Sequence, residues 1–105
     1  PTARREEDPV APAGVFATGK AVAEAMVRRA LPGRHLILRT GWVYGPDERD
    51  RGLAGSLVRR LAAGDPVAVA SDRFGQPTYA PDLAACALDL ALRGETGTWH
   101  AVGPE

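Results

Sequence analysis

Apolar residues recur at helical spacing in three stretches of the chain. These stretches cover about residues 13–31, 53–62 and 81–92. A repeat of about 3.6 residues places the apolar side chains on one face of an amphipathic helix. A glycine follows each stretch, as is common after a helix: Gly33, Gly64 and Gly94. We therefore expect three helices.

Short apolar runs of strand length lie between these helices. Residues 35–39 (HLILR) form a nearly continuous run, and shorter runs occupy 66–70 (PVAVA) and 98–102 (TWHAV). A continuous rather than alternating run is typical of a strand covered on both faces, as in a parallel sheet. Glycine and proline in 40–51 and 71–79 predict irregular loops there. Alternating helices and strands predict an α/β fold with a mainly parallel sheet.

One charged residue interrupts the apolar face of the first helix. At about 100° per residue, Lys20 lies between Val27 and Leu31, and Phe16 lies one turn earlier on the same face. A lysine within a core-facing stripe costs free energy unless its charge is satisfied. We interpret Lys20 as aimed at a functional cleft. The alternative is a side chain that extends its ammonium group to solvent from the edge of the stripe.

Composition excludes several classes of protein. The chain has 105 residues, enough for one small domain, and its 13 basic and 13 acidic residues give no net charge. This balance argues against nucleic acid or a membrane surface as a partner. Cys86 is the single cysteine, which excludes an internal disulfide and a cysteine-built metal site and favours a cytoplasmic location. Because the chain begins at Pro1, we expect it to belong to a longer polypeptide.

The start of the first helix nearly matches a phosphate-binding loop. Residues 14–20 have the spacing G-x-x-x-x-G-K, but Ala21 replaces the Ser or Thr that would hold Mg²⁺. Residues 9–12 (PVAP), which precede the motif, are a poor strand. The dinucleotide fingerprint G-x-G-x-x-G is absent from the sequence. The sequence therefore argues against a nucleoside triphosphatase.

Five segments carry motifs in a specific order. They are residues 6–12 (EEDPVAP), 16–24 (FATGKAVAE), 38–46 (LRTGWVYGP), 72–84 (DRFGQPTYAPDLA) and 98–105 (TWHAVGPE). The first two resemble the acidic loop and the Y-G-x-S-K helix, with its downstream glutamate, of the extended short-chain dehydrogenase/reductase family. The other three are similar to R-T-x-W-V-Y-G, D-x-x-G-x-P-T-x-x-x-D-L-A and G-x-Y-H-x-x-G of its dTDP-4-dehydrorhamnose reductase branch. The resemblance covers nearly the whole chain.

This resemblance implies a Rossmann-type parallel sheet with flanking helices, of which residues 1–105 are the C-terminal part. The dinucleotide-binding half would lie in the N-terminal part missing from this sequence. The implied activity is the NAD(P)H-dependent reduction of a keto group on a nucleotide-activated deoxysugar. NADP or NAD would be bound mainly by the missing part, and the substrate would be a nucleotide sugar. The oligomeric state stays open, a homodimer included.

The resemblance also implies roles for individual residues. Phe16 occupies the position of the catalytic tyrosine, and Lys20 would bind the nicotinamide ribose. Arg39 and Thr40, at the end of a buried strand, are the further cofactor contacts that we expect. Expected substrate contacts are Trp42, Tyr44, Arg73, Gln76 and Thr78. We interpret Asp82 as a helix-end charge and His100 as structural.

Phe16 departs from the family pattern, because a phenyl ring cannot donate a proton. Three explanations remain open: a noncatalytic homologue, a natural or engineered change from tyrosine, or a proton from another group such as Tyr44 or Tyr79. Whether the chain is enzymatic therefore stays open. The alternative function is a regulatory or interaction subunit of the same fold, for which the beta subunit of methionine adenosyltransferase is a precedent.

Overall fold

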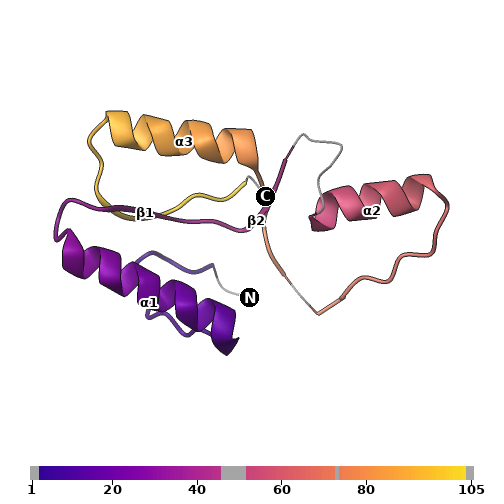
Figure 1. Ribbon diagram of the computed structural model, residues 1–105, viewed down its shortest axis with the longest axis horizontal. Helices are drawn as coiled ribbons and strands as arrows, with labels where there is room; N and C mark the ends of the chain where they lie inside the picture. Colours follow the sequence, from indigo (N-terminus) through magenta and orange to yellow (C-terminus); the bar gives the residue numbers. More distant parts are fainter. Residues whose placement is uncertain (1–2, 46–51, 73, 104–105) are drawn as a thin grey trace. The chain divides into compact units, whose positions relative to one another are not determined.

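The computed structural model describes residues 3–45, 52–72 and 74–103. Its elements follow the order helix, strand, strand, helix, strand, helix, strand (Figure 1). The chain divides into two compact units, one formed by residues 1–39 and 88–100 and the other by 40–87 and 101–105. Both units contain parallel strands, so the predicted α/β class with parallel pairing is confirmed.

In the first unit, a pair of parallel strands lies between helices. β1 (Leu36–Arg39) pairs with β4 (Gly97–His100), and the register sets Arg39 beside His100 at the C-terminal ends. Helix α1 (Gly14–Ala30) lies on one side of this pair and residues 88–92 of the last helix on the other (Figure 1). Ligands of open parallel sheets bind at the carboxyl ends of the strands. This end is therefore where a site is expected.

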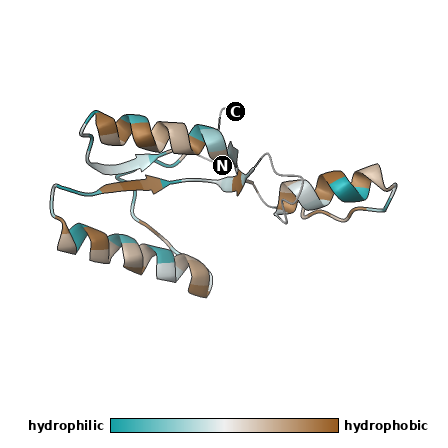
Figure 2. Ribbon diagram, turned by 45° about the horizontal axis from the view of Figure 1, so that its top comes forward, coloured by the Kyte–Doolittle hydropathy of each residue, from teal (hydrophilic) through white to brown (hydrophobic). Residues whose placement is uncertain are grey.

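The apolar stripe predicted on α1 lies at the surface of the described structure and does not pack against a core within these residues. Val15 is 92% exposed, Phe16 79% and Met26 66%. The half-buried side chains form a different line along the helix: Ala17, Ala21, Glu24 and Arg28. This line faces the strands because its charged members bond to side chains of β1 and β4. Apolar residues along α1 and α3 consequently remain at the surface (Figure 2).

The second unit is built on a shorter parallel pair. β2 (Trp42–Tyr44) pairs with β3 (Pro77–Tyr79), and α3 (Ala80–Leu92) follows β3 without a loop. Helix α2 (Leu53–Ala62) confirms the second predicted helix.

Four predictions about the strands need correction. β2 and β3 lie in stretches predicted to be loops, whereas residues 66–70 were expected to be a strand and form none. Each three-residue strand is stabilised by its partner, which local composition does not reveal. A β-branched run without a partner gains no ladder hydrogen bonds, which explains the third difference. The last strand begins and ends earlier than predicted, at Gly97–His100 instead of 98–102.

A small cluster around Thr78 is the most buried part of the described structure. Thr78 is 3% exposed and Ala101 9%, and they are the two described residues in the buried class. The Thr78 hydroxyl donates to the Gln76 carbonyl at 3.4 Å and accepts from the Gly103 amide at 3.4 Å. A Cβ atom on Gly103 would overlap the carbonyl oxygen of Pro77. The glycine therefore permits the close approach of the backbone to β3.

We expect Gly103→Ala to lower the free energy of unfolding by about 1–3 kcal/mol, because the added methyl group forces the backbone away from Pro77. Urea denaturation measures the change. The matched control is Gly19→Ala, where a Cβ meets nothing within 4 Å inside a helix. That variant should be about as stable as the wild type, or up to about 1 kcal/mol more stable. Equal effects of the two substitutions would contradict the close approach.

No helix in the described ranges is long and apolar enough to cross a bilayer.

Candidate functional site

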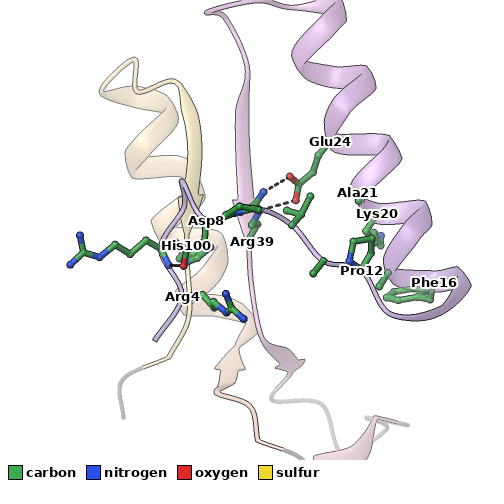
Figure 3. Close-up of a pocket in the computed structure, with 14 residues that line it drawn as sticks. Arg4, Asp8, Pro12, Phe16, Lys20, Ala21, Glu24, Arg39 and His100 are labelled. Carbon is green, nitrogen blue, oxygen red and sulfur yellow. Dashed lines mark hydrogen bonds and ion pairs between the residues drawn. The ribbon is translucent and has the colours of Figure 1, made fainter. Parts of the chain in front are cut away.

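A pocket with a volume of about 480 Å³ lies at the C-terminal ends of β1 and β4 (Figure 3). The last residues of both strands, Arg39 and His100, line it. The other lining residues come from the N-terminal segment and from α1: Arg4, Arg5, Asp8, Pro9, Val10, Ala11, Pro12, Phe16, Ala17, Lys20, Ala21 and Glu24. The whole pocket belongs to the first unit.

Phe16 and Lys20 contribute neighbouring side chains to the wall of this pocket. The Lys20 Nζ atom lies 5.5 Å from the centroid of the Phe16 ring. A cation over an aromatic face at this distance is attracted by the ring quadrupole. The structure thus gives Lys20 the pocket position expected from the sequence, although its role toward a ligand stays a prediction. The phenyl ring supplies an apolar surface at the position where the resemblance implies a tyrosine.

Glu24 and Arg39 form a two-pronged ion pair at the back of the pocket. Arg39 donates from Nε to Glu24 Oε1 at 2.9 Å and from Nη2 to Oε2 at 2.8 Å. Both side chains are about four-fifths buried, with 20% and 18% exposed. The Arg39 bonds hold the pKa of Glu24 below its ordinary value and raise that of Arg39. The two hydrogen bonds between these mostly buried side chains fix α1 to the end of β1.

A second arginine extends this network to β4. Arg28 Nη2 donates to Glu24 Oε2 at 2.9 Å and to Thr98 Oγ1 at 3.0 Å. Glu24 therefore accepts from two arginines, and the network joins α1 to β1 through Arg39 and to β4 through Arg28.

The acidic loop is attached to the same strand ends through Glu6. Its carbonyl accepts from Arg39 Nη1 at 3.3 Å, and its carboxylate accepts from the His100 backbone amide at 2.9 Å. The hydrogen bond from the His100 amide lowers the pKa of the Glu6 carboxyl group. A turn closes beside it, where Asp8 accepts from the Arg5 amide at 2.9 Å and donates its own amide to the Arg5 carbonyl. The loop is thereby held as one wall of the pocket.

The predicted cofactor contacts Arg39 and Thr40 fall in different units. Three of the N–H groups of Arg39 are engaged by Glu24 and Glu6, so its main observed task is to hold the pocket together. Thr40 is exposed at the surface of the second unit. Contact of either residue with a cofactor stays a prediction.

The predicted substrate contacts lie in the second unit, apart from Arg73, which is outside the described residues. Trp42 is 47% exposed, and its indole lies against Gly75. The rings of Tyr44 and Tyr79 lie 5.4 Å apart and are tilted by 43°. Gln76 is half-buried.

A pocket of about 350 Å³ adjoins the two tyrosines and is also lined by Thr78. Because the Thr78 hydroxyl is buried and bonded to two backbone groups, its observed role is structural. Neither tyrosine belongs to the unit that contains Phe16, and a proton supplied by Tyr44 or Tyr79 stays a prediction. The substrate roles stay predictions.

Sequence reasoning missed three pocket features. It gave no role to Arg4, it did not foresee that Glu6 ties the loop to the sheet, and it did not foresee that His100 contributes through its backbone. One signal was available: Glu24 follows Lys20 by one helical turn, so the carboxylate shares a side of the helix with the lysine and needs a basic partner. Asp82 does lie in the first turn of α3, as interpreted.

The sequence of the chain is similar to those of known proteins. The family described as "RmlD substrate binding domain" matches residues 1–105. The dTDP-4-dehydrorhamnose reductase of Mycobacterium tuberculosis (strain ATCC 25618 / H37Rv) is 42% identical over 92 residues, which cover 86% of this chain and 29% of that protein. The dTDP-4-dehydrorhamnose reductase of Streptomyces griseus is 34% identical over 116 residues, covering 96% and 38%.

A third relative carries a different name. The probable dTDP-4,6-dihydroxy-2-methyloxan-3-one 4-ketoreductase of Streptomyces antibioticus is 36% identical over 97 residues, covering 91% of this chain and 32% of that protein. The chain spans about a third of the length of these curated relatives. No solved structure gives a significant match. Because the family match extends over all 105 residues, the chain belongs to the RmlD substrate binding domain family.

Proposed function

We propose that this chain is the substrate-binding part of an NAD(P)H-dependent reductase that acts on the keto group of a nucleotide-activated deoxysugar. The observation that carries the proposal is Lys20 in the wall of a pocket at the carboxyl ends of parallel strands. The names of the relatives, which are dTDP-sugar reductases, support the substrate class. A dTDP-linked 4-keto sugar is accordingly the substrate that we propose.

The residues present fit a nicotinamide cofactor at this pocket. The pocket is open enough for a ring, and the Lys20 ammonium group can donate hydrogen bonds to ribose hydroxyls. When bound, the cofactor supplies hydride to the carbonyl carbon. The Glu24–Arg39 pair holds the helix that carries Lys20, so that its ammonium group is positioned before a ligand arrives. The cofactor, NADP or NAD, together with a homodimeric assembly and a cytoplasmic location, stays a prediction.

We also propose that residues 1–105 are the C-terminal part of the enzyme, and that a dinucleotide-binding half precedes them. The exposed apolar faces support this division of the chain. Val15 and Val22 on α1, and Leu88 and Leu92 on α3, are between 53% and 92% exposed. Side chains of this size are stabilised by about 1.5–3 kcal/mol each when buried, so an adjoining part of the same sheet would cover them.

Phe16 favours a second candidate function, a noncatalytic subunit that binds the nucleotide sugar. In this case the fold and the pocket are retained, but the group that protonates the substrate oxygen is absent. Binding without turnover would be the expected property.

The test uses the full-length protein that contains this chain. NADPH oxidation is followed by the loss of nicotinamide absorbance with a dTDP-4-keto-6-deoxy sugar, and binding of the same sugar nucleotide is measured by calorimetry. Turnover establishes the reductase, and binding without turnover establishes the second candidate. Absence of both turnover and binding would reject the proposal.

A further inference from the structure

We infer that Glu6 is a positioning residue, which holds residues 4–12 against the ends of β1 and β4 and so sets one side of the pocket before a ligand arrives. We call residues 4–12 the loop wall. The inference rests on the proposed function, because it concerns how the same pocket receives its ligand. Figure 3 shows the loop wall passing from the strand ends to the start of α1.

The loop wall supplies half of the residues that line the pocket, but Glu6 is not among them. The lining residues of the loop wall are Arg4, Arg5, Asp8, Pro9, Val10, Ala11 and Pro12. A substitution of Glu6 therefore removes no side chain that lines the pocket. Any effect on binding must arise through the position of the loop wall.

Glu6 is the described residue through which the loop wall is hydrogen-bonded to the strands. Its carboxylate Oε1 accepts from the His100 amide at 2.9 Å, and its carbonyl accepts from Arg39 Nη1 at 3.3 Å. The stretch from Pro9 to Pro12 is exposed, and Val10 has 53% of its surface in solvent. Because this stretch buries little apolar surface, the two hydrogen bonds of Glu6 are the main attachment of the loop wall within the described residues.

A closed turn carries this attachment to neighbouring residues of the loop wall. The Asp8 amide donates to the Arg5 carbonyl at 3.2 Å, and the Asp8 carboxylate accepts from the Arg5 amide at 2.9 Å. Glu6 lies inside this turn. Fixing its side chain therefore also fixes Arg5 and Asp8, which line the pocket.

The charge of Glu6 strengthens the attachment. The hydrogen bond from the His100 amide holds the pKa of Glu6 below its ordinary value, so the group is ionised near neutral pH. A hydrogen bond to an ionised acceptor is stronger than one between neutral groups. Glu7 is the matched comparison, because it carries the same charge on the next residue but is exposed, and Glu6 is the one that accepts from the His100 amide.

The experiment compares Glu6→Ala with Glu7→Ala in the full-length protein. Hydrogen–deuterium exchange with mass spectrometry measures the opening of the loop wall and, separately, of β1 and β4. In Glu6→Ala we expect exchange in the loop wall to become about threefold to tenfold faster, the effect of losing one hydrogen bond, while exchange in the strands stays unchanged. Glu7→Ala should exchange like the wild type. Glu6→Gln keeps an acceptor oxygen and should fall between Glu6→Ala and the wild type.

Calorimetry then measures the consequence for binding. We expect Glu6→Ala to raise the Kd of a dTDP-4-keto-6-deoxy sugar by about threefold to tenfold, because the ligand must now order the loop wall as it binds. The Kd of the nicotinamide nucleotide that binds, NADP⁺ or NAD⁺, should change less, since we expect the preceding half of the chain to hold most of the cofactor. Glu7→Ala should leave both Kd values unchanged.

The outcomes separate this inference from the proposed function. If the loop wall of Glu6→Ala exchanges as slowly as that of Glu7→Ala, or if β1 and β4 open together with it, the inference is wrong. If the loop wall opens but the sugar nucleotide binds as tightly as before, the inference is also wrong, while the proposed function stands. An equal rise in the Kd of both ligands would indicate general loosening and would reject the positioning role. If the wild type binds none of the probes, the proposed function is overturned and the positioning role with it.

Discussion

Replacing Phe16 with tyrosine in the full-length protein is expected to raise kcat for the NADPH-dependent reduction of a dTDP-4-keto sugar by about 10²–10⁴-fold, the usual contribution of a positioned general acid. The physical reason is the arrangement around the ring. The Lys20 Nζ lies 5.5 Å from the ring centroid, and a nearby cation lowers the pKa of a phenol. The pKa of a hydroxyl added to this ring would therefore be lowered toward the working pH. Steady-state kinetics at saturating NADPH measure the change.

Two variants control this result. Phe16→Leu changes the side chain without adding a hydroxyl, so it should not raise kcat. In the Phe16→Tyr background, Lys20→Met should remove the gain, because the cation is lost. If the wild type is already as active as Phe16→Tyr, another group supplies the proton, and the noncatalytic alternative is rejected. If Phe16→Tyr binds the sugar but stays inactive, the tyrosine position is not the missing element.

Replacing Glu24 with alanine is expected to lower the free energy of unfolding by about 2–3 kcal/mol, the size of several charge-assisted hydrogen bonds lost at a mostly buried site. The substitution leaves Arg28 and Arg39 without their shared carboxylate, and Arg39 is only 20% exposed. It also releases α1 from β1, so that Lys20 loses its fixed position. Urea denaturation of the full-length protein measures the loss.

Asp89→Ala is the matched control, because Asp89 forms an ion pair with Arg93 at the C-terminal end of α3, with the same four-residue spacing as Glu24 and Arg28 and with side chains 55% and 67% exposed. Exposed pairs contribute little, so we expect a change below about 1 kcal/mol. An equal loss of unfolding free energy in both variants would show that the Glu24 network contributes no more to stability than an exposed ion pair does.

The pH dependence gives a second measure of the same pair. The pKa of Glu24 is held below its ordinary value of 4.5, mainly by the bond from Arg39. A lowered pKa means that the unfolded state binds the proton first as the pH falls. The stabilisation is therefore complete above pH 4.5 and is lost as the pH drops through the lower, folded value. The gap in Tm between wild type and Glu24→Ala should shrink below pH 4.5, and a constant gap would contradict the assignment.

The sequence predicted the helices and the strand at residues 35–39 because their signals are local. Helical periodicity and a terminal glycine depend on neighbours within about one turn, and α1, α2 and α3 all formed where this pattern placed them. The strands β2 and β3 were not predicted, because a strand of three residues is too short to show a recognisable pattern of apolar and polar positions. Their stability depends on a partner more than 30 positions away, from Trp42 to Pro77.

The periodicity of apolar residues in α1 did not predict which face of this helix contacts the strands. Its apolar residues predicted one buried face, but the face that contacts the strands carries Glu24 and Arg28. A long-range ion pair with Arg39 decided the orientation, and no periodicity within the helix encodes such a partner. The same reason hid the role of Glu6, whose contacts lie on strands 33 and 94 positions away.

By itself, the sequence determined the α/β class, the three helices and the family motifs, and it placed Phe16 at the position where the resemblance implies a tyrosine. These follow from residue identity and from patterns among neighbouring residues, and both can be read directly from the sequence. Only the tertiary structure showed that Arg39 clamps Glu24, that Glu6 fastens the loop to His100, and that Arg4 shares a pocket with Lys20. Each of these contacts joins segments that parallel pairing of β1 with β4 brings to one edge, so their meeting depends on the topology of the sheet.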